Sequence, residues 1–346
     1  MPFPVRLASA FALLSVSLGT HVASAQGFDT PGNVLISDQF NNRVIEVDAF
    51  KNIVFSSGSG DPTLCNPGPG AIIAPNDVER LENGLTLIAG TGTGACPDNR
   101  VILVDRKGRI LFQYGKAGVT GAGRNELNTP VFAIQTPRGN FLITDQGNNR
   151  IILVDPYKNI LFTYGPASGP GALNAPNSAE LLPNGHILIA DENNSRVIEI
   201  NRAGQIVWQF SKGLNTVAFA SRLPDGDTLI ADAGNNRIVE VNMAGKLVFL
   251  YATNHAPDSR ANPQPTGAVR LKNGDTLIAD QFNNRVFAID AAKRTVYQYG
   301  VTNRVGNGFN HLNAPYSAMV IGDYTGQTPP AGFGGAFAVG ANEVRN

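Results

Sequence analysis

Side chains that could do chemistry are concentrated in a recurring turn of the form Asp-x-x-Asn-Asn-Arg. The turn brings a carboxylate, amides and a guanidinium together, but a catalytic site is normally unique and this turn recurs along the chain. Asp and Arg five residues apart can pair across a tight turn, and Asn caps backbone groups there. We therefore expect a structural role for the repeated charged residues. They are Asp38, Arg43, Arg100, Asp145, Arg150, Asp191, Arg196, Asp232, Arg237, Asp280 and Arg285.

Two histidines outside these turns are weak candidates for catalysis. His255 and His311 lie in segments that connect predicted strands, where a histidine can act as a general base or bind a metal. Neither belongs to a His-x-x-x-His or Glu-x-x-His pattern, and a loop histidine without such partners more often has no special role. We therefore assign no catalytic residue from the sequence.

The elements that position these side chains belong to an internal repeat. Each copy opens with a glycine, carries Asp six residues later, then Arg, and has an aromatic residue twelve residues after that Arg. The copy at 85–105 differs, because Gly90 stands in place of Asp and the turn is lengthened by the insertion Thr91 to Asp98. The other copies lie at 33–48, 140–155, 186–201, 227–242 and 275–290.

Each copy predicts four consecutive antiparallel strands. Short segments rich in β-formers alternate with turns, and Asn-Gly or Asp-Gly before the second strand is a strong hairpin signal. The recurring aromatic residues fall on the fourth strand, where we expect them to pack between neighbouring units. Units of about 45 to 50 residues have the size of a propeller blade.

The two ends of the array predict that it closes into a ring. The first copy lacks a first strand, and a surplus first-strand pattern follows the last copy at 313–326. We expect Ser317 to Ile321 to pair with Val34 to Ser37, which would remove the exposed edge of an open array. The predicted fold class is all-β: a six-bladed propeller of four-stranded antiparallel blades, closed by the C-terminal strand.

The segment LFQYGKAGVTGAGRNELNTPVFAIQTPRGNFLITDQGNNRIILVD, at 111–155, resembles the NHL repeat. The resemblance extends over about 32 to 321 and implies a six-bladed β-propeller. NHL propellers serve as platforms for protein or RNA, as sensor domains and occasionally as enzymes, so the resemblance implies a fold more than a function. Six-bladed relatives include lactonases, the amidating lyase and arylsulfotransferases, and LLPNGHILIADENN is similar to the arylsulfotransferase style of repeat.

The first strands of such a ring would surround an axial channel with polar residues at its mouth. Lactonase-like propellers bind calcium in the channel through Asn, Asp and Glu, and calcium prefers oxygen ligands. By this resemblance calcium is the candidate cofactor, and whether the channel holds a metal stays open. Strand alternation would aim Asp77 and Glu79 the same way and Asn76 the other. The candidate ligand-binding residues are Asn76, Asp77, Glu79, Asn177, Glu180 and Tyr316.

The N-terminus predicts export from the cytoplasm. An arginine, an apolar run at 7–18 and a small-x-small site predict a signal peptide, residues 1–25, that is cleaved near Ala25. The propeller would occupy 26–327, and a tail rich in Gly, Ala and Pro would follow at 328–346. In a secreted or periplasmic protein Cys65 and Cys96 are a candidate disulfide, the alternative being two free thiols.

Charge and hydropathy narrow the classes of partner. The 346 residues include 27 basic and 27 acidic side chains with no basic run, which argues against a nucleic-acid surface. Beyond the N-terminus no apolar run reaches the roughly 18 residues of a membrane span. We expect a monomeric binding scaffold whose loops and channel mouth contact an unknown protein or small-molecule ligand. The alternative is a channel-centred enzyme of the lactonase, lyase or arylsulfotransferase-like type.

Overall fold

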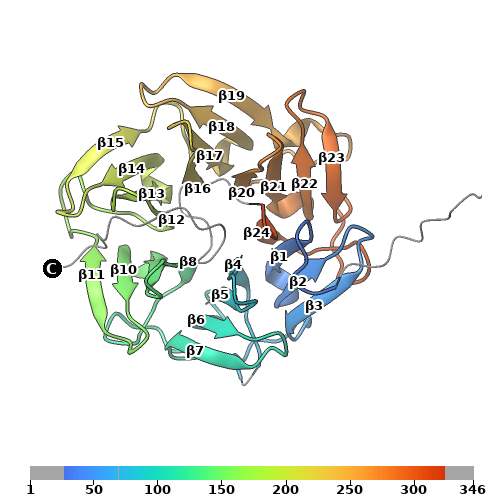
Figure 1. The fold of residues 1–346 in the computed structure, drawn as a ribbon, viewed down its shortest axis with the longest axis horizontal. Coiled ribbons are helices and arrows are strands. Elements are labelled where there is room, and N and C mark those ends of the chain that lie inside the picture. Colours follow the sequence, from blue (N-terminus) through green and yellow to red (C-terminus); the bar gives the residue numbers. More distant parts are fainter. Residues whose placement is uncertain (1–26, 69, 324–346) are drawn as a thin grey trace, which may run out of the picture.

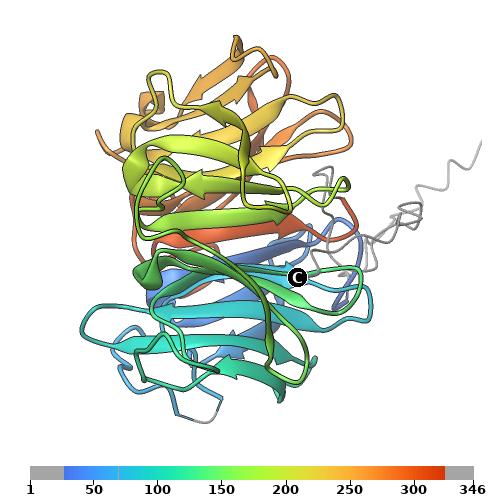
Figure 2. The same ribbon diagram turned by 90° about the vertical axis from the view of Figure 1, so that its left-hand side faces the viewer.

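The chain folds as a six-bladed β-propeller, which confirms the predicted fold class. The structure is a computed structural model that describes residues 27–68 and 70–323. In this part of the chain, six four-stranded antiparallel sheets stand around a central axis (Figure 1). Seen from the side, the strands run across the ring from one face towards the other (Figure 2). The predicted signal peptide, 1–25, and the tail, 328–346, lie outside the described residues.

Each blade runs from an inner strand at the axis to an outer strand at the rim (Figure 1). In five blades a 3-10 turn joins the second and third strands, and η5 (Thr253–His255) follows β19 instead. Blade 1 consists of β24 (Pro315–Val320), β1 (Val34–Asp38), η1 (Gln39–Asn41), β2 (Arg43–Val47) and β3 (Ile53–Gly58). Blade 2 consists of β4 (Pro75–Arg80), β5 (Thr86–Gly92), β6 (Pro97–Val104) and β7 (Ile110–Gly115). Blade 3 consists of β8 (Pro130–Gln135), β9 (Phe141–Asp145), η2 (Gln146–Asn148), β10 (Arg150–Val154) and β11 (Ile160–Tyr164). Blade 4 consists of β12 (Pro176–Leu181), β13 (Ile187–Asp191), η3 (Glu192–Asn194), β14 (Arg196–Ile200) and β15 (Ile206–Phe210). Blade 5 consists of β16 (Val217–Arg222), β17 (Thr228–Asp232), η4 (Ala233–Asn235), β18 (Arg237–Val241) and β19 (Leu247–Ala252). Blade 6 consists of β20 (Pro265–Arg270), β21 (Thr276–Asp280), η6 (Gln281–Asn283), β22 (Arg285–Ile289) and β23 (Thr295–Tyr299).

The ring is closed by the last strand, as the sequence predicts. Strand β24 pairs antiparallel with β1, and Met319 lies opposite Leu35 while Ala318 lies opposite Ile36. The closing blade therefore combines residues from both ends of the described chain. Strand β24 supplies the inner strand that β1 would otherwise lack, so the first copy is completed as a four-stranded blade and the array has no open end.

Hydrophobic clusters fill the spaces between neighbouring blades. Phe112 on β7 stacks on Phe141 of the next blade with ring centroids 4.3 Å apart, and Tyr114 is fully buried in the same cluster. The corresponding residues of other blades, including Phe162 and Trp208, also pack against such clusters. The expectation that the fourth-strand aromatic residues form an inter-blade core is therefore confirmed.

Buried ion pairs that were not predicted from the sequence join three pairs of blades. A glutamate on a third strand pairs with an arginine at the end of the next inner strand, as in Glu199–Arg222 at 2.8 Å. An aromatic residue of the fourth strand covers that guanidinium. The Arg222 Cζ atom lies 4.6 Å from the centroid of the Trp208 ring. The equivalent pairs are Glu46–Arg80 at 2.9 Å and Glu240–Arg270 at 2.6 Å.

Every inner strand begins with a β-bulge, which determines what faces the axis. In blade 2, Pro75 lies opposite Gly90 and Asp77 opposite Ala89, so that Asn76 is an extra residue between them. A bulge interrupts side-chain alternation and re-aims the residues next to it. The extra residues of the six bulges are Asn76, Val131, Asn177, Ala218, Thr266 and Tyr316.

Candidate functional site

The repeated Asp, Asn and Arg residues fasten the incoming loops, by which we mean the segments that lead from one blade into the next inner strand. In blade 3 Asp145 accepts bonds from Arg150 at 2.7 Å, from Asn148 at 2.8 Å and from the backbone N–H of Asn128 at 2.8 Å. Asn128 belongs to the incoming loop, so one carboxylate holds both the turn and the loop. Burial raises the pKa of Asp145, and the bonds to Asn148 and Arg150 oppose that rise. The same ion pair recurs as Asp38–Arg43, Asp191–Arg196, Asp232–Arg237 and Asp280–Arg285.

Blade 2 obtains the same carboxylate from a different residue. Asp98, at the end of the insertion, pairs with Arg100 and accepts the backbone N–H of Ile73 at 2.7 Å. A Cβ atom on Gly90 would lie 2.8 Å from the Asp98 carboxylate, which therefore occupies the space of the missing side chain. The insertion thus changes the sequence pattern and keeps the interaction.

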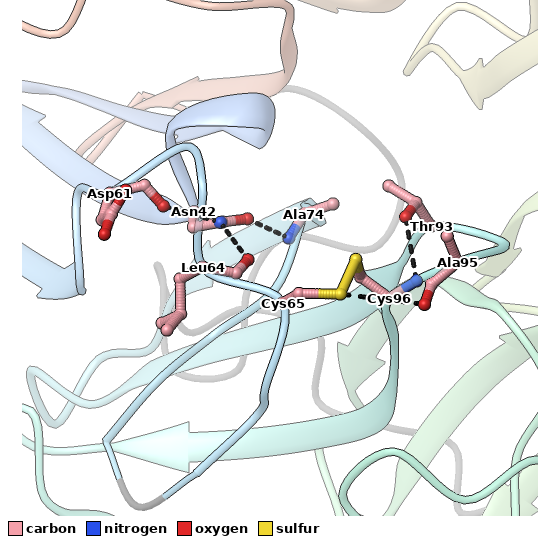
Figure 3. The surroundings of a disulfide bond; sticks show 8 residues. All are labelled: Asn42, Asp61, Leu64, Cys65, Ala74, Thr93, Ala95 and Cys96. Carbon is pink, nitrogen blue, oxygen red and sulfur yellow. Dashed lines mark hydrogen bonds between the residues drawn. A yellow bond between two sulfur atoms is a disulfide. The ribbon is translucent and has the colours of Figure 1, made fainter.

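The residue before each repeated Arg, which is Asn in every blade except blade 4, where it is Ser195, ties one blade to the next. The amide of Asn42 accepts the backbone N–H of Ala74 at 2.8 Å and donates to the carbonyls of Asp61 and Leu64 (Figure 3). Ala74 has φ of 40°, so this bond supports a left-handed residue that directly precedes the inner strand. Equivalent bonds join Asn99 to Thr129, Asn149 to Ala175, Ser195 to Thr216, Asn236 to Gln264 and Asn284 to Ala314.

The two cysteines form a disulfide on the same face. Cys65 of the loop between β3 and β4 is bonded to Cys96, which precedes β6, and their Cα atoms are 4.9 Å apart (Figure 3). The Cys96 N–H also bonds to the Thr93 hydroxyl at 3.2 Å. The bond joins the incoming loop of blade 2 to its lengthened turn, which confirms the predicted disulfide.

The inner strands enclose a cavity of about 60 Å³ on the axis. The extra residue of each of the six bulges lines it, and so do Asp77 and Glu79. The expectation that Asn76 points away from Asp77 and Glu79 is therefore wrong, because the bulge interrupts the alternation on which it was based. Of the candidate residues, the cavity brings together Asn76, Asp77, Glu79, Asn177 and Tyr316. Glu180 lies outside this lining, and its carboxylate accepts the Ser221 hydroxyl at 3.1 Å and the Arg222 N–H at 2.8 Å.

One side of the cavity mouth is bridged by amide hydrogen bonds from blades 6, 1 and 2. Gln281 donates to Gln39 at 2.8 Å, and Gln39 donates to Asn76 at 2.7 Å. A bond between Asn76 and the Tyr316 hydroxyl carries this chain to the closing strand. Each glutamine directly follows a repeated Asp, which is the sequence signal that could have identified them.

The chain of bonds continues from the closing strand into blades 4 and 3. Asn177 donates to the Tyr316 hydroxyl and to the Glu192 carboxylate, both at 2.7 Å. Gln146 donates to the same carboxylate at 2.8 Å. Burial raises the pKa of Tyr316 and of Glu192. The polar residues of the mouth are therefore bonded to one another around most of the ring.

Two carboxylates occupy one wall of the cavity. Asp77 accepts the backbone N–H of Ala133 and Glu79 that of Gln135, each at 3.1 Å. Burial raises the pKa of Asp77 to about 6. Burial also raises the pKa of Glu79, and the neighbouring Asp77 adds to that rise. Asp77 can therefore gain or lose a proton near neutral pH.

The mouth residues do not fit a calcium ion as they stand. Calcium takes six to eight oxygen ligands, whereas the oxygens of Asn76, Glu192 and Tyr316 already bond to neighbouring side chains. Within the described residues, one group of three side chains lies close enough together to hold a metal ion: Asp225, Asp227 and Glu240, far along the chain from Asp77. Glu240 of that group pairs with Arg270 at 2.6 Å, so its charge is already compensated.

The histidines are separate from the cavity. His255 ends η5 and is exposed, and His311 bonds through Nδ1 to the carbonyl of Phe309 at 2.9 Å. Neither lines the cavity, and His186 lies 2.6 Å from Glu199 beside the inter-blade ion pair with Arg222. The structure therefore does not bring together His255, His311 and the carboxylates.

No protein-family model and no curated protein matches this chain. Among solved structures, a protein of unknown function from Bacteroides caccae is 17% identical with a TM-score of 0.61, covering 84% of this chain and 98% of that one. Selenomethionine-substituted virginiamycin B lyase from Staphylococcus aureus is 15% identical with a TM-score of 0.54, covering 82% of this chain and 84% of that one. The WD40 β-propeller domain of Doa1 is 11% identical with a TM-score of 0.50, covering 71% of each chain.

These likenesses concern the fold, because the identities are far below those that indicate a shared activity. The neighbours include both a lyase and an interaction domain of WD40 type. The helices of the described segments are 3-10 turns of three residues, too short to cross a bilayer. The chain, itself a six-bladed propeller, is thus similar in architecture to virginiamycin B lyase and to the WD40 propeller domain of Doa1.

Proposed function

We propose that this chain is an exported propeller of the NHL-repeat type that binds a partner through its incoming loops and channel mouth. The repeated turns and the propeller fold support the NHL assignment. The disulfide supports a compartment outside the cytoplasm, since disulfides persist in oxidising environments.

The observation that carries the proposal is a set of exposed apolar side chains on firmly held loops. In the loop before β24, Val305 and Phe309 are 59% and 64% exposed, and Phe40 of the adjoining η1 turn is 36% exposed. Phe40 donates its backbone N–H to Asn313 of this loop at 3.0 Å, and Asn41 donates to the Gly306 carbonyl at 2.8 Å, so the η1 turn adjoins the loop that carries Val305 and Phe309. We call Phe40, Val305 and Phe309 the loop patch.

Comparison with the equivalent loop of blade 3 shows that Phe309 is a replacement. Both loops bond a glycine N–H to an asparagine at the same position, as Gly115 to Asn125 and Gly300 to Asn310, each at 3.1 Å. Arg124, the residue before Asn125, reaches the outer turn of its blade and donates to Asn159 at 2.9 Å. Phe309 takes that position in the closing blade and is largely exposed. An exposed aromatic residue on a held loop is typical of a binding surface.

Site-specific crosslinking tests this proposal. A photo-crosslinking amino acid replaces the exposed Asn307 in the loop, and a matched control carries it at the exposed Ala244 in the β18–β19 turn. In extracellular or periplasmic extract of the source organism, we expect a discrete adduct from position 307 alone. Phe309→Ser should reduce that adduct about tenfold, as removal of an interface anchor does. Equal adducts from both positions, or none from position 307, would contradict the proposal.

A channel enzyme is the second candidate function. The observation that favours it is Asp77, a buried carboxyl group beside a cavity whose pKa lies near 6, within the range of a general acid or base. The mature protein can be assayed on simple lactones and on quinupristin, the compound present with an inactive variant of virginiamycin B lyase from Staphylococcus aureus. Turnover that falls by about a hundredfold or more in Asp77→Asn would support this function. Turnover that Asp77→Asn leaves unchanged would exclude Asp77 as the catalytic group.

A further inference from the structure

We propose that the axial cavity binds a small organic cation, with an ammonium group at Asp77 and Glu79 and an alkyl group against Phe132 and Phe219. The inference deepens the proposed function, because it assigns a ligand class to the channel. It does not depend on the loop patch, so the two can fail separately.

The first argument is an uncompensated acidic wall. Asp77 and Glu79 are each 6% exposed and both line the cavity. Within residues 27–68 and 70–323, neither carboxylate forms a salt bridge. Over the same residues, Glu79 receives one hydrogen bond, from Gln135 to Oε2, so its Oε1 atom is left without a donor. A buried carboxylate without a cation is unfavourable, and a bound ammonium ion would supply the missing charge.

The second argument is the chemistry of the other walls of the cavity. Phe132 of blade 3 and Phe219 of blade 5 have ring centroids 5.9 Å apart, and both line the cavity together with Ile134 and Val269. Such walls offer no ligands to a metal ion, which needs several oxygens. They suit an alkyl chain, and aromatic rings also attract cations. The combination of acidic and apolar walls therefore favours an amphipathic organic cation over a metal.

Blade 4 supplies an internal contrast. Glu180 stands at the same register position in β12 as Glu79 does in β4, and each accepts the N–H of the next inner strand. Glu180 also accepts the Ser221 hydroxyl and does not line the cavity. A buried inner-strand carboxylate is thus not enough to make a site. Glu79 differs because it lines the cavity and because, among the described residues, its second oxygen has no hydrogen-bond donor.

The size of the cavity limits the ligand. A water molecule needs roughly 10–15 Å³ of such a volume, so about 60 Å³ holds about four to six water-sized groups. The n-propylammonium ion, with three carbons and one nitrogen, fits within that number and is the appropriate probe. Its neutral counterpart, 1-propanol, has nearly the same shape and lacks the charge.

The ionisable groups around the cavity predict how binding depends on pH. Asp77 and Glu79 come from β4 and Tyr316 from β24, and Glu192 of η3 adjoins Tyr316 through Asn177. Burial raises the pKa of Asp77 to about 6 and raises that of Glu79 as well. A cation binds the ionised carboxylates, so affinity should increase as the pH is raised from about 5 to about 7.5.

Calorimetric titration of the folded mature protein with n-propylammonium chloride at constant ionic strength tests the proposal. We expect saturable binding that 1-propanol and calcium chloride do not reproduce. Asp77→Asn and Glu79→Gln should each weaken it about tenfold or more, as loss of a charged hydrogen-bond partner does. The matched control Glu180→Gln should leave the affinity unchanged.

A second variant keeps the test decisive if a carboxylate substitution prevents folding. Gly267 lines the cavity, and a Cβ atom there would meet its nearest neighbour, the Tyr316 carbonyl oxygen, at an ordinary contact distance of 3.4 Å. Gly267→Leu should abolish binding by filling the cavity while both carboxylates remain. Absence of saturable binding, equal binding of 1-propanol, or a preference for calcium would each overturn the proposal. Because the crosslinking test at position 307 concerns the loop patch and not the cavity, none of these results would decide its outcome.

Discussion

In blade 2 the carboxylate of Asp98 takes the place of the repeated Asp, at whose position the chain has Gly90. We therefore predict that substitutions at positions 90 and 98 have strongly coupled effects on the free energy of unfolding. Asp98→Ala removes the partner of Arg100, whose side chain is 3% exposed, and the acceptor of the Ile73 N–H. Removing one member of a buried ion pair costs about 3–5 kcal/mol. At about 2 °C per kcal/mol for a chain of this size, Tm should fall by about 6–10 °C.

The second substitution, Gly90→Asp, is harmful alone and corrective in combination. Alone it forces a side chain into the space of the Asp98 carboxylate, 2.8 Å from the Cβ position, and adds a like charge. Combined with Asp98→Ala, it returns a carboxylate to the position opposite Arg100, which is the register of Asp145 and Arg150 in blade 3. The unfolding free energy of the double variant should therefore lie within about 1 kcal/mol of that of the natural protein. If the two sites were independent, its loss would instead equal the sum of the two single losses to within about 0.5 kcal/mol.

Denaturant unfolding of the four proteins under oxidising conditions measures this cycle. Fluorescence of the single tryptophan and far-ultraviolet circular dichroism provide two probes, and a thiol assay verifies that the disulfide is intact in every variant. The reasoning predicts a favourable coupling of at least about 3 kcal/mol, well above the limit of simple additivity. Additive destabilisation, or a neutral Asp98→Ala, would refute the equivalence of Asp98 with the repeated Asp.

Two further predictions concern the disulfide and the cavity. Replacing Cys65 and Cys96 by serine, or reducing them, should lower the unfolding free energy by about 3–4 kcal/mol because the bond closes a segment of 31 residues; an unchanged denaturation midpoint in reductant would contradict this. Burial raises the pKa of Asp77 from 3.8 to about 6, so the folded state keeps a proton between those pH values that the unfolded state has lost. This group should therefore lower stability by about 2 kcal/mol as the pH rises from 4 to 7. The pH profile of Asp77→Asn, measured by urea unfolding, should be flatter by that amount, and identical profiles would refute it.

Features that repeat could be predicted from the sequence because each copy supports the others. The missing first strand before Val34 and the surplus strand around Ala318 together predicted the closed ring. The compartment expected from the N-terminal segment made Cys65 and Cys96 a candidate disulfide, and the two are bonded. Aromatic residues at a constant offset indicated packing between blades, which Phe112 shows.

Two kinds of feature were not predicted: those that depend on a local distortion of the backbone, and those in which one residue takes the place of another that is several positions away in the sequence. The bulge at Asn76 changes which way a side chain points without changing the strand pattern. Asp98 replaces a side chain eight residues away, which only the geometry reveals. The inter-blade ion pairs had a readable signal, since Glu199 and Arg222 are charged where the equivalent pair Leu153 and Leu181 is apolar.

The closed ring is the central claim, because the cavity and its mouth exist only if the last strand completes the first blade. Amide hydrogen exchange followed by mass spectrometry tests it on the folded protein. The account predicts that peptides covering 34–38 and 315–320 are protected together, as strongly as peptide 187–191 of blade 4. Rapid exchange of 315–320 beside a protected blade 4 would contradict the account.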